Sequence, residues 1–170
     1  MTRALDRNST LPKFSADGRW IYFIADDDGT QQLLRVPATG GAIERPIGGR
    51  KMVQAFSLGK DGSVAATIAD LTQLAEVYAL AGGDLKKITT TNDAVLAELR
   101  LPEVEYVHFK SKDGTTIAGY LYKPVGYQAG MKYPTILRPH GGPVWAYYAE
   151  FMFDAQLFRS EERRVGKECQ

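Results

Sequence analysis

The feature that most constrains the fold of this chain is a repeat with a spacing of 42 residues. Phe14-Ser15 recurs as Phe56-Ser57, and Gly40-Gly41 recurs as Gly82-Gly83. Between these pairs, each copy carries an Asp-Gly dipeptide and two apolar runs separated by a polar turn. Asp-Gly and Gly-Gly favour tight hairpins because they tolerate positive φ. This period, with several strands per copy, indicates two β-propeller blades over residues 1–90, and a generic antiparallel meander is the alternative.

The apolar runs predict where the strands of each copy lie. In the first copy they cover 20–25, 33–36 and 42–47, and in the second 64–69, 76–80 and 85–88. Two blades cannot close a ring and would leave open strand edges. We therefore expect a propeller with this repeat to contain further blades, encoded upstream of Met1.

The repeat stops near residue 90, where we expect a linker over 91–102. Thr91-Asn92-Asp93 is typical of a helix N-terminus, the run 94–99 is apolar, and Pro102 follows. A second domain is then predicted over 103–158. Its opening runs, 103–111 and 115–123, flank Lys112-Asp113-Gly114, which indicates a hairpin.

A candidate catalytic loop lies in the second domain. The run 134–137 has the composition of a buried strand, and it leads directly to His140-Gly141-Gly142-Pro143. Glycines after a strand allow a turn that leaves backbone N–H groups uncommitted, and such groups suit an oxyanion hole. The alternative is an ordinary strand-to-loop turn.

The last twelve residues do not continue this pattern. Residues 159–170 read RSEERRVGKECQ, with seven charged side chains, and they follow the apolar helical start Gln156-Leu157-Phe158. The run resembles a conceptual translation of a sequencing adapter, so we interpret it as a non-native tail. On this interpretation Cys169, which is the only cysteine, carries no information about redox compartment.

Composition excludes several classes of function. With 21 basic and 20 acidic side chains, no global field favours nucleic acid or anionic membrane as a partner. No apolar run approaches the roughly 20 residues of a membrane span, and residues 1–8 contain no signal-peptide core. We expect a cytoplasmic protein. A metal site is not expected, because His108 and His140 lack clustered ligands and Asp26-Asp27-Asp28-Gly29 lacks the last glutamate of a calcium loop.

The order of motifs along residues 3 to 158 resembles the prolyl oligopeptidase family of serine peptidases, especially its acylaminoacyl-peptidase and dipeptidyl-aminopeptidase-like branch. A repeat ending in Gly-Gly is followed by Val107-His108-Phe109-Lys110-Ser111-Lys112-Asp113-Gly114, Leu121-Tyr122-Lys123-Pro124, Tyr133-Pro134, His140-Gly141-Gly142-Pro143 and Gln156-Leu157-Phe158.

The resemblance implies a propeller followed by the first strands of an α/β-hydrolase domain, incomplete in this chain. It also implies hydrolysis of short peptides by a serine nucleophile, with a peptide substrate in the full-length parent and no cofactor or metal. By position, Gly141 or Gly142 would supply an oxyanion-hole N–H, while His140 would shape the loop rather than act as the base.

The sequence departs from the family in one respect, because it contains no Gly-x-Ser-x-Gly. Ser63 lies in Asp-Gly-Ser-Val-Ala, which indicates a hairpin. In α/β-hydrolases the Ser, Asp and His of the triad follow the His-Gly-Gly loop, so we expect all three beyond Phe158 in the parent. The chain alone is expected to be inactive. The alternative from another class is a non-enzymatic propeller module that binds a protein or peptide.

Overall fold

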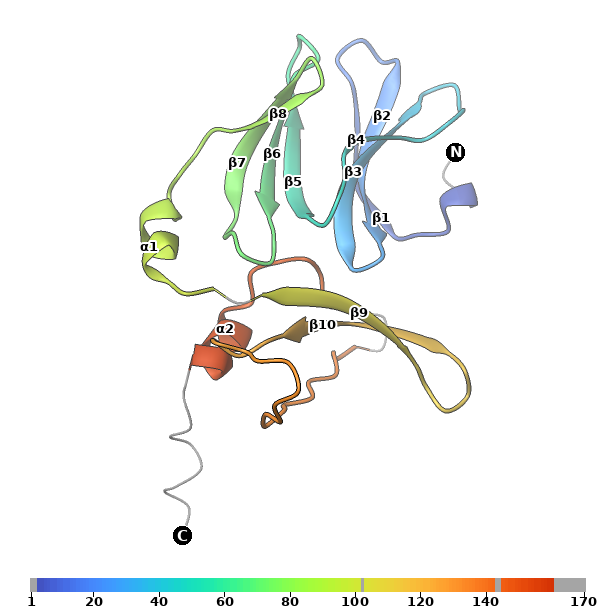
Figure 1. Ribbon diagram of the computed structural model, residues 1–170. Helices are drawn as coiled ribbons and strands as arrows, with labels where there is room; N and C mark the ends of the chain where they lie inside the picture. The colour runs from blue at the N-terminus through green and yellow to red at the C-terminus, as the bar shows by residue number, and fades with distance from the viewer. Residues whose placement is uncertain (1–2, 102, 143–144, 161–170) are drawn as a thin grey trace. The chain divides into compact units, whose positions relative to one another are not determined.

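The computed structural model describes residues 3–101, 103–142 and 145–160 (Figure 1). The chain is mainly β and divides into two compact units. Unit 1 comprises Met1–Leu96 together with Tyr148–Phe151, and unit 2 comprises Ala97–Tyr147 and Met152–Gln170. Tyr148–Phe151 therefore belongs structurally with the repeat, although it follows the candidate loop in sequence.

Unit 1 contains one sheet of eight strands, in the order β1-β2-β3-β5-β6-β7-β8 with β4 paired to β3. A short 3-10 helix, Arg3–Leu5, precedes them. The strands are β1 (Ser9–Phe14), β2 (Trp20–Asp27), β3 (Thr30–Pro37), β4 (Glu44–Ile47), β5 (Met52–Leu58), β6 (Val64–Ala69), β7 (Glu76–Ala81) and β8 (Asp84–Lys87). The strands that the apolar runs predict are therefore present.

The sheet consists of two four-stranded modules that follow one another in sequence. The first module is β1–β4 and the second is β5–β8, and neighbouring strands within each are antiparallel. A single parallel pair, Gln31 with Met52, joins β3 to β5. Figure 1 shows the modules as the blue and green groups of strands. The 42-residue repeat thus corresponds to a repeated four-stranded unit.

The main core lies between the two modules. Because side chains alternate across a strand, Val64, Ala66 and Ile68 of β6 share one face. The buried residues of this core are Tyr22, Ile24, Leu33, Ile47, Val53, Phe56, Val64, Ala66 and Ile68. A smaller core covers the opposite face of β2 and β3, with Phe23, Ala25, Leu34 and Val36 packed against Leu5, Ile21 and Ile43. Consequently β2 and β3 are apolar on both faces.

The Asp-Gly dipeptides form the hairpin turns predicted from sequence. Gly18 and Gly62 have φ of +68° and +84°, values that glycine adopts readily. The Asp61 carboxylate accepts hydrogen bonds from the backbone N–H of Ser63 at 3.1 Å and from its hydroxyl at 2.6 Å. Ser63 is therefore a structural residue of the turn between β5 and β6.

The short helix predicted after the repeat is α1 (Asp93–Glu98). Its first turn is held by Glu76, whose side chain is almost fully buried at 2% exposure. The Glu76 carboxylate accepts from the backbone N–H and the side-chain amide of Asn92, at 2.8 and 3.1 Å, and from the Thr89 hydroxyl. The hydrogen bond from Thr89 is the main cause that lowers the pKa of Glu76 to about 2.

Unit 2 contains the hairpin of β9 (Val104–Lys110) and β10 (Thr116–Tyr122) and the helix α2 (Phe153–Ser160). The strands pair in continuous antiparallel register from Lys110–Thr116 to Val104–Tyr122. Gly114 in the turn has φ of +85°, so the hairpin signal is confirmed. Arg159 and Ser160 end α2, and the rest of the predicted non-native tail, 161–170, lies outside the described residues.

The strand expected over 134–137 is wrong for this structure. These residues form no strand, and Ile136 and Leu137 are 71% and 87% exposed. The sequence carries strand propensity, but a strand also requires a hydrogen-bonded neighbour. Among the described residues of unit 2, β9 and β10 pair only with each other, and the segment 134–137 pairs with neither of them.

Candidate active-site loop

The candidate loop, His140-Gly141-Gly142, ends an irregular segment that follows β10. All three residues are exposed, and Pro143 lies outside the described residues. The loop belongs to unit 2.

The two glycines leave backbone donors uncommitted. Gly142 has φ of +122°, a conformation that side chains with a Cβ rarely adopt. At Gly141 an added Cβ would meet no atom within 4 Å, so the backbone is open on that side. Neither glycine N–H donates a hydrogen bond to another described residue. Free, adjacent N–H groups in an open turn can bind an oxygen that carries negative charge.

His140 turns back on the loop. Its Nδ1 lies 2.9 Å from the carbonyl oxygen of Gly141, and its ring meets the Tyr147 ring edge-on at 6.3 Å between centroids. Within the described chain, no carboxylate or hydroxyl forms a hydrogen bond with this imidazole. A general base requires an orienting partner within hydrogen-bond reach. The loop-shaping role of His140 stays a prediction.

A second group of contacts near the loop was not predicted from the sequence. It involves Arg138, Tyr147 and Asp154. The Arg138 guanidinium forms an ion pair with Asp154 in the first turn of α2. Its Cζ also lies 5.6 Å from the Tyr147 ring centroid, within cation–π range. Tyr147 therefore contacts both Arg138 and His140. Arg138 lies in irregular chain and Asp154 in a helix 16 positions later, so no periodic signal predicts their pairing.

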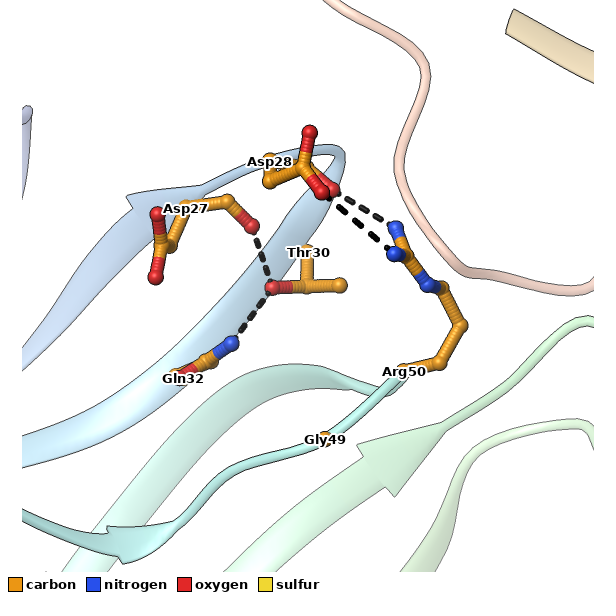
Figure 2. A pocket seen from close by; sticks show the side chains of 6 residues that line it. All are labelled: Asp27, Asp28, Thr30, Gln32, Gly49 and Arg50. Carbon is orange, nitrogen blue, oxygen red and sulfur yellow. Dashed lines mark hydrogen bonds and ion pairs between the residues drawn. The ribbon is translucent and has the colours of Figure 1, made fainter. Parts of the chain in front are cut away.

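One concave feature of unit 1 is at the tight turn between β2 and β3 (Figure 2). It is a shallow pocket of about 220 Å³, lined by Asp27, Asp28, Thr30, Gln32, Gly49 and Arg50. Arg45 pairs with the Asp27 carboxylate at 2.6 Å, and Arg50 pairs with that of Asp28 at 3.4 Å. The carboxylates of Asp27 and Asp28 in this hairpin turn thus face guanidinium groups.

The polar groups inside this pocket also bond to one another. Figure 2 shows the Thr30 hydroxyl between the Asp27 backbone and the Gln32 amide. It donates to the Asp27 carbonyl at 2.5 Å and accepts from Gln32 Nε2 at 2.9 Å. The pocket is therefore part of a rigid turn.

His108 is a residue of β9, and its ring meets that of Tyr106 edge-on at 4.9 Å. Among the described residues, no three histidine, cysteine, aspartate or glutamate side chains gather as a metal site would require. No helix in the described part of the chain has the length and apolar character needed to cross a membrane.

We compared the chain with protein-family models, curated proteins and solved structures. No protein-family model matches the chain. The chain is 26% identical over 153 residues to the uncharacterized peptidase YuxL of Bacillus subtilis, covering 88% of this chain and 23% of that protein. It is 28% identical over 151 residues to a probable dipeptidyl-peptidase 5 of Aspergillus clavatus, covering 83% and 20% respectively.

A similar solved structure is an acylaminoacyl peptidase in complex with Z-Gly-Gly-Phe-chloromethyl ketone. It matches with a TM-score of 0.80 and 25% identity, over 93% of this chain and 24% of that chain. The chain thus spans between a fifth and a quarter of the length of these proteins. A match over 93% of the chain extends into both units.

Proposed function

We propose that the parent protein, a prolyl oligopeptidase-family peptidase to which the chain corresponds in part, is a serine-type enzyme that hydrolyses short peptides through an acyl-enzyme. The observation that carries this proposal is the match to the acylaminoacyl peptidase over 93% of the chain. The peptidyl chloromethyl ketone bound to that protein supports a peptide as the substrate class.

The two four-stranded modules are the first part of the proposed architecture. Each is an antiparallel group of four strands, and the modules repeat at the 42-residue spacing. Their contact through one parallel pair and a shared apolar core fits neighbouring propeller blades, which pack face to face. We assign β1–β4 and β5–β8 to two blades of a larger propeller.

The second part is the opening of an α/β-hydrolase domain. The hairpin of β9 and β10, the His140-Gly141-Gly142 loop and α2 follow one another in the expected order. In this assignment a backbone N–H of Gly141 or Gly142 stabilises the oxyanion of the tetrahedral intermediate, and His140 shapes the loop. The open backbone at Gly141 and the uncommitted donors support this role.

The catalytic serine, aspartate and histidine are not assigned to residues of this chain. Its sequence has no Gly-x-Ser-x-Gly, and Ser63 is committed to a hairpin turn. In the parent, the triad would follow the loop in chain order. The 170-residue chain by itself should therefore bind at most the carbonyl oxygen of a substrate, without the nucleophile that attacks it.

The proposal is tested by expressing the complete reading frame of the source gene. We expect turnover of short peptidyl p-nitroanilides and covalent labelling by a fluorophosphonate, which reacts with activated serines. The 170-residue chain, purified in parallel, should show neither. A folded full-length product that binds peptides without turnover or labelling would contradict the proposal and favour the non-enzymatic propeller module.

A further inference from the structure

Residues Tyr148–Phe151, which follow the candidate loop in sequence, pack with the repeat in unit 1. Tyr148 donates a hydrogen bond from its phenol to the Asp26 carboxylate at 3.1 Å. The next residue, Ala149, is fully buried and donates its backbone N–H to the carbonyl of Gly29 at 2.8 Å. Both acceptors belong to the β2–β3 hairpin, and all four residues lie in unit 1.

The Asp26 carboxylate, which accepts the hydrogen bond from Tyr148, is oriented by further donors. The Asp26 carboxylate also accepts from the side-chain amides of Gln31, at 2.9 Å, and Asn8, at 3.3 Å. Three donors thus converge on one carboxylate, which limits the orientations it can adopt. Charge-assisted hydrogen bonds of this kind are stronger than those between neutral groups.

The turn that carries Gly29 is fixed as well. Asp28 and Gly29 have φ of +48° and +70°, as in the tight hairpin turns that match strand twist. From the loop between β4 and β5, Arg50 donates to the backbone carbonyl of Asp28 at 2.7 Å, and Figure 2 shows its side chain reaching over the turn. The Gly29 carbonyl is therefore presented by a rigid element.

The environment of Tyr148 supports a specific contact. Burial, reinforced by the neighbouring Asp26 carboxylate, raises the pKa of the Tyr148 phenol to about 12. The phenol therefore keeps its proton, and its role as hydrogen-bond donor, across the physiological range. Burial also raises the pKa of the nearby Glu150 carboxyl.

Chain connectivity links this contact to the candidate loop. Only five residues separate Gly142 from Tyr148, so a fully extended chain between them spans at most about 22 Å. A short segment fixed at one end samples fewer conformations than a free one, since closing a short span removes chain entropy.

We propose that Asp26 and Tyr148 are positioning residues, which anchor the chain after His140-Gly141-Gly142 to the β2–β3 turn and so restrict the conformations of that loop. An effect of this anchor on catalysis rests on the proposed function. The hydrogen bonds that form the anchor do not depend on it. A residue of the repeat unit would then contribute to the geometry of the loop through the chain that connects them.

The experiment uses the 170-residue chain and needs no turnover. Trp20 and Trp145 are its two tryptophans, so Trp20→Phe leaves Trp145, between the loop and the anchor, as the sole fluorophore. Time-resolved anisotropy then reports local motion of this segment, and hydrogen exchange with mass spectrometry reports opening at Ala149.

The variant is Tyr148→Phe, which removes only the phenol oxygen. The matched control is Tyr147→Phe, because its neighbouring phenol donates no hydrogen bond to a described residue.

Loss of one hydrogen bond changes an opening equilibrium by about two- to tenfold. We expect Tyr148→Phe to speed exchange at Ala149 by that factor and to increase the fast component of Trp145 anisotropy, while Tyr147→Phe changes neither. Asp26→Asn should reproduce both effects, and exchange in β2 and β3 should stay slow in all variants.

Unchanged Trp145 motion in Tyr148→Phe and Asp26→Asn would overturn the positioning role, even if Ala149 exchanged faster. Exchange at Ala149 as fast in the parent chain as in an unfolded peptide would overturn the anchor itself. Neither result bears on whether the complete protein is a peptidase, because that question is decided by turnover and serine labelling.

Discussion

Tyr148 and Asp26 are 122 residues apart in sequence, yet the phenol of one donates to the carboxylate of the other at 3.1 Å. This hydrogen bond, with that from Ala149 to Gly29, brings Tyr148–Phe151 into unit 1 although the residues before and after it belong to unit 2. The repeat and residues Tyr148–Phe151 are therefore parts of one compact unit.

The first prediction concerns the titration of Tyr148. Since burial and Asp26 raise its pKa from 10.0 to about 12, the folded protein holds the phenolic proton more tightly than the unfolded chain does. The free energy of unfolding should therefore fall as pH rises from about 10 to about 12. A difference ultraviolet titration of the parent chain against Tyr148→Phe should show one phenol ionising in that range. A difference curve centred near pH 10 would contradict the buried contact.

A second prediction concerns Gly142 in the complete peptidase. Its φ of +122° is strained for any residue with a Cβ, so Gly142→Ala should displace the backbone N–H. Loss of an oxyanion donor typically lowers kcat by about 100- to 1000-fold, with a smaller effect on KM.

The matched control for that experiment is Gly130→Ala. Gly130 also has positive φ, +85°, and open space around it, but it lies outside the loop. The control should keep kcat within a few-fold of the parent. Equal kcat for the two variants would show that backbone strain, and not a lost donor, controls the rate.

Glu76 should make the stability of unit 1 sensitive to acid. Its pKa is lowered from 4.5 to about 2, first by the Thr89 hydroxyl and then by donors at Asn92. The stabilisation is fully present above pH 4.5 and is lost as pH falls towards about 2. Glu76→Gln should lower the urea midpoint at pH 7 and flatten its dependence on pH across that window. The exposed Glu98→Gln serves as control and should retain the parent's pH dependence.

The ion pair between Arg138 and Asp154 should be weak. The two side chains are 53% and 42% exposed, and exposed pairs contribute about 0.2–1 kcal/mol. A double-mutant cycle with Arg138→Gln and Asp154→Asn should give a coupling energy in that range, which decreases in 1 M salt. A coupling above about 2 kcal/mol would mean that the pair is desolvated, contrary to this structure.

Leu33 should be a strong determinant of the stability of unit 1. It is fully buried where β3 meets the main core, and Leu→Ala at such sites costs about 2–5 kcal/mol. Leu11→Ala, at a side chain that is 47% exposed, should change the free energy of unfolding by less than about 0.5 kcal/mol. Similar effects of the two substitutions in urea unfolding would contradict the assigned core.

Much of the β structure could be predicted because its determinants are local. The Asp17-Gly18 and Asp61-Gly62 turns need positive φ, which glycine supplies, and an apolar run of strand length follows each turn. The α1 helix likewise begins at residues that favour an N-terminus. Such signals depend on a few neighbouring residues, so they survive without tertiary context.

The determinants of the candidate site are not local. The segment 134–137 has strand propensity but lacks a hydrogen-bonded neighbour among the described residues, so it stays irregular. The contacts of Tyr148 with Asp26 and of Arg138 with Asp154 join polar side chains that sequence analysis cannot pair. Only the glycines of the loop carry a signal of their own, because positive φ at Gly142 limits which residues can stand there.

The most direct test of the central claim is the sequence of the source gene beyond the codon for Phe158. The account predicts that the frame continues without RSEERRVGKECQ and reaches a strand and a Gly-x-Ser-x-Gly motif, followed by an aspartate and then a histidine. Further 42-residue repeats in place of that motif, or a frame that ends at Gln170, would contradict the assignment to a serine peptidase.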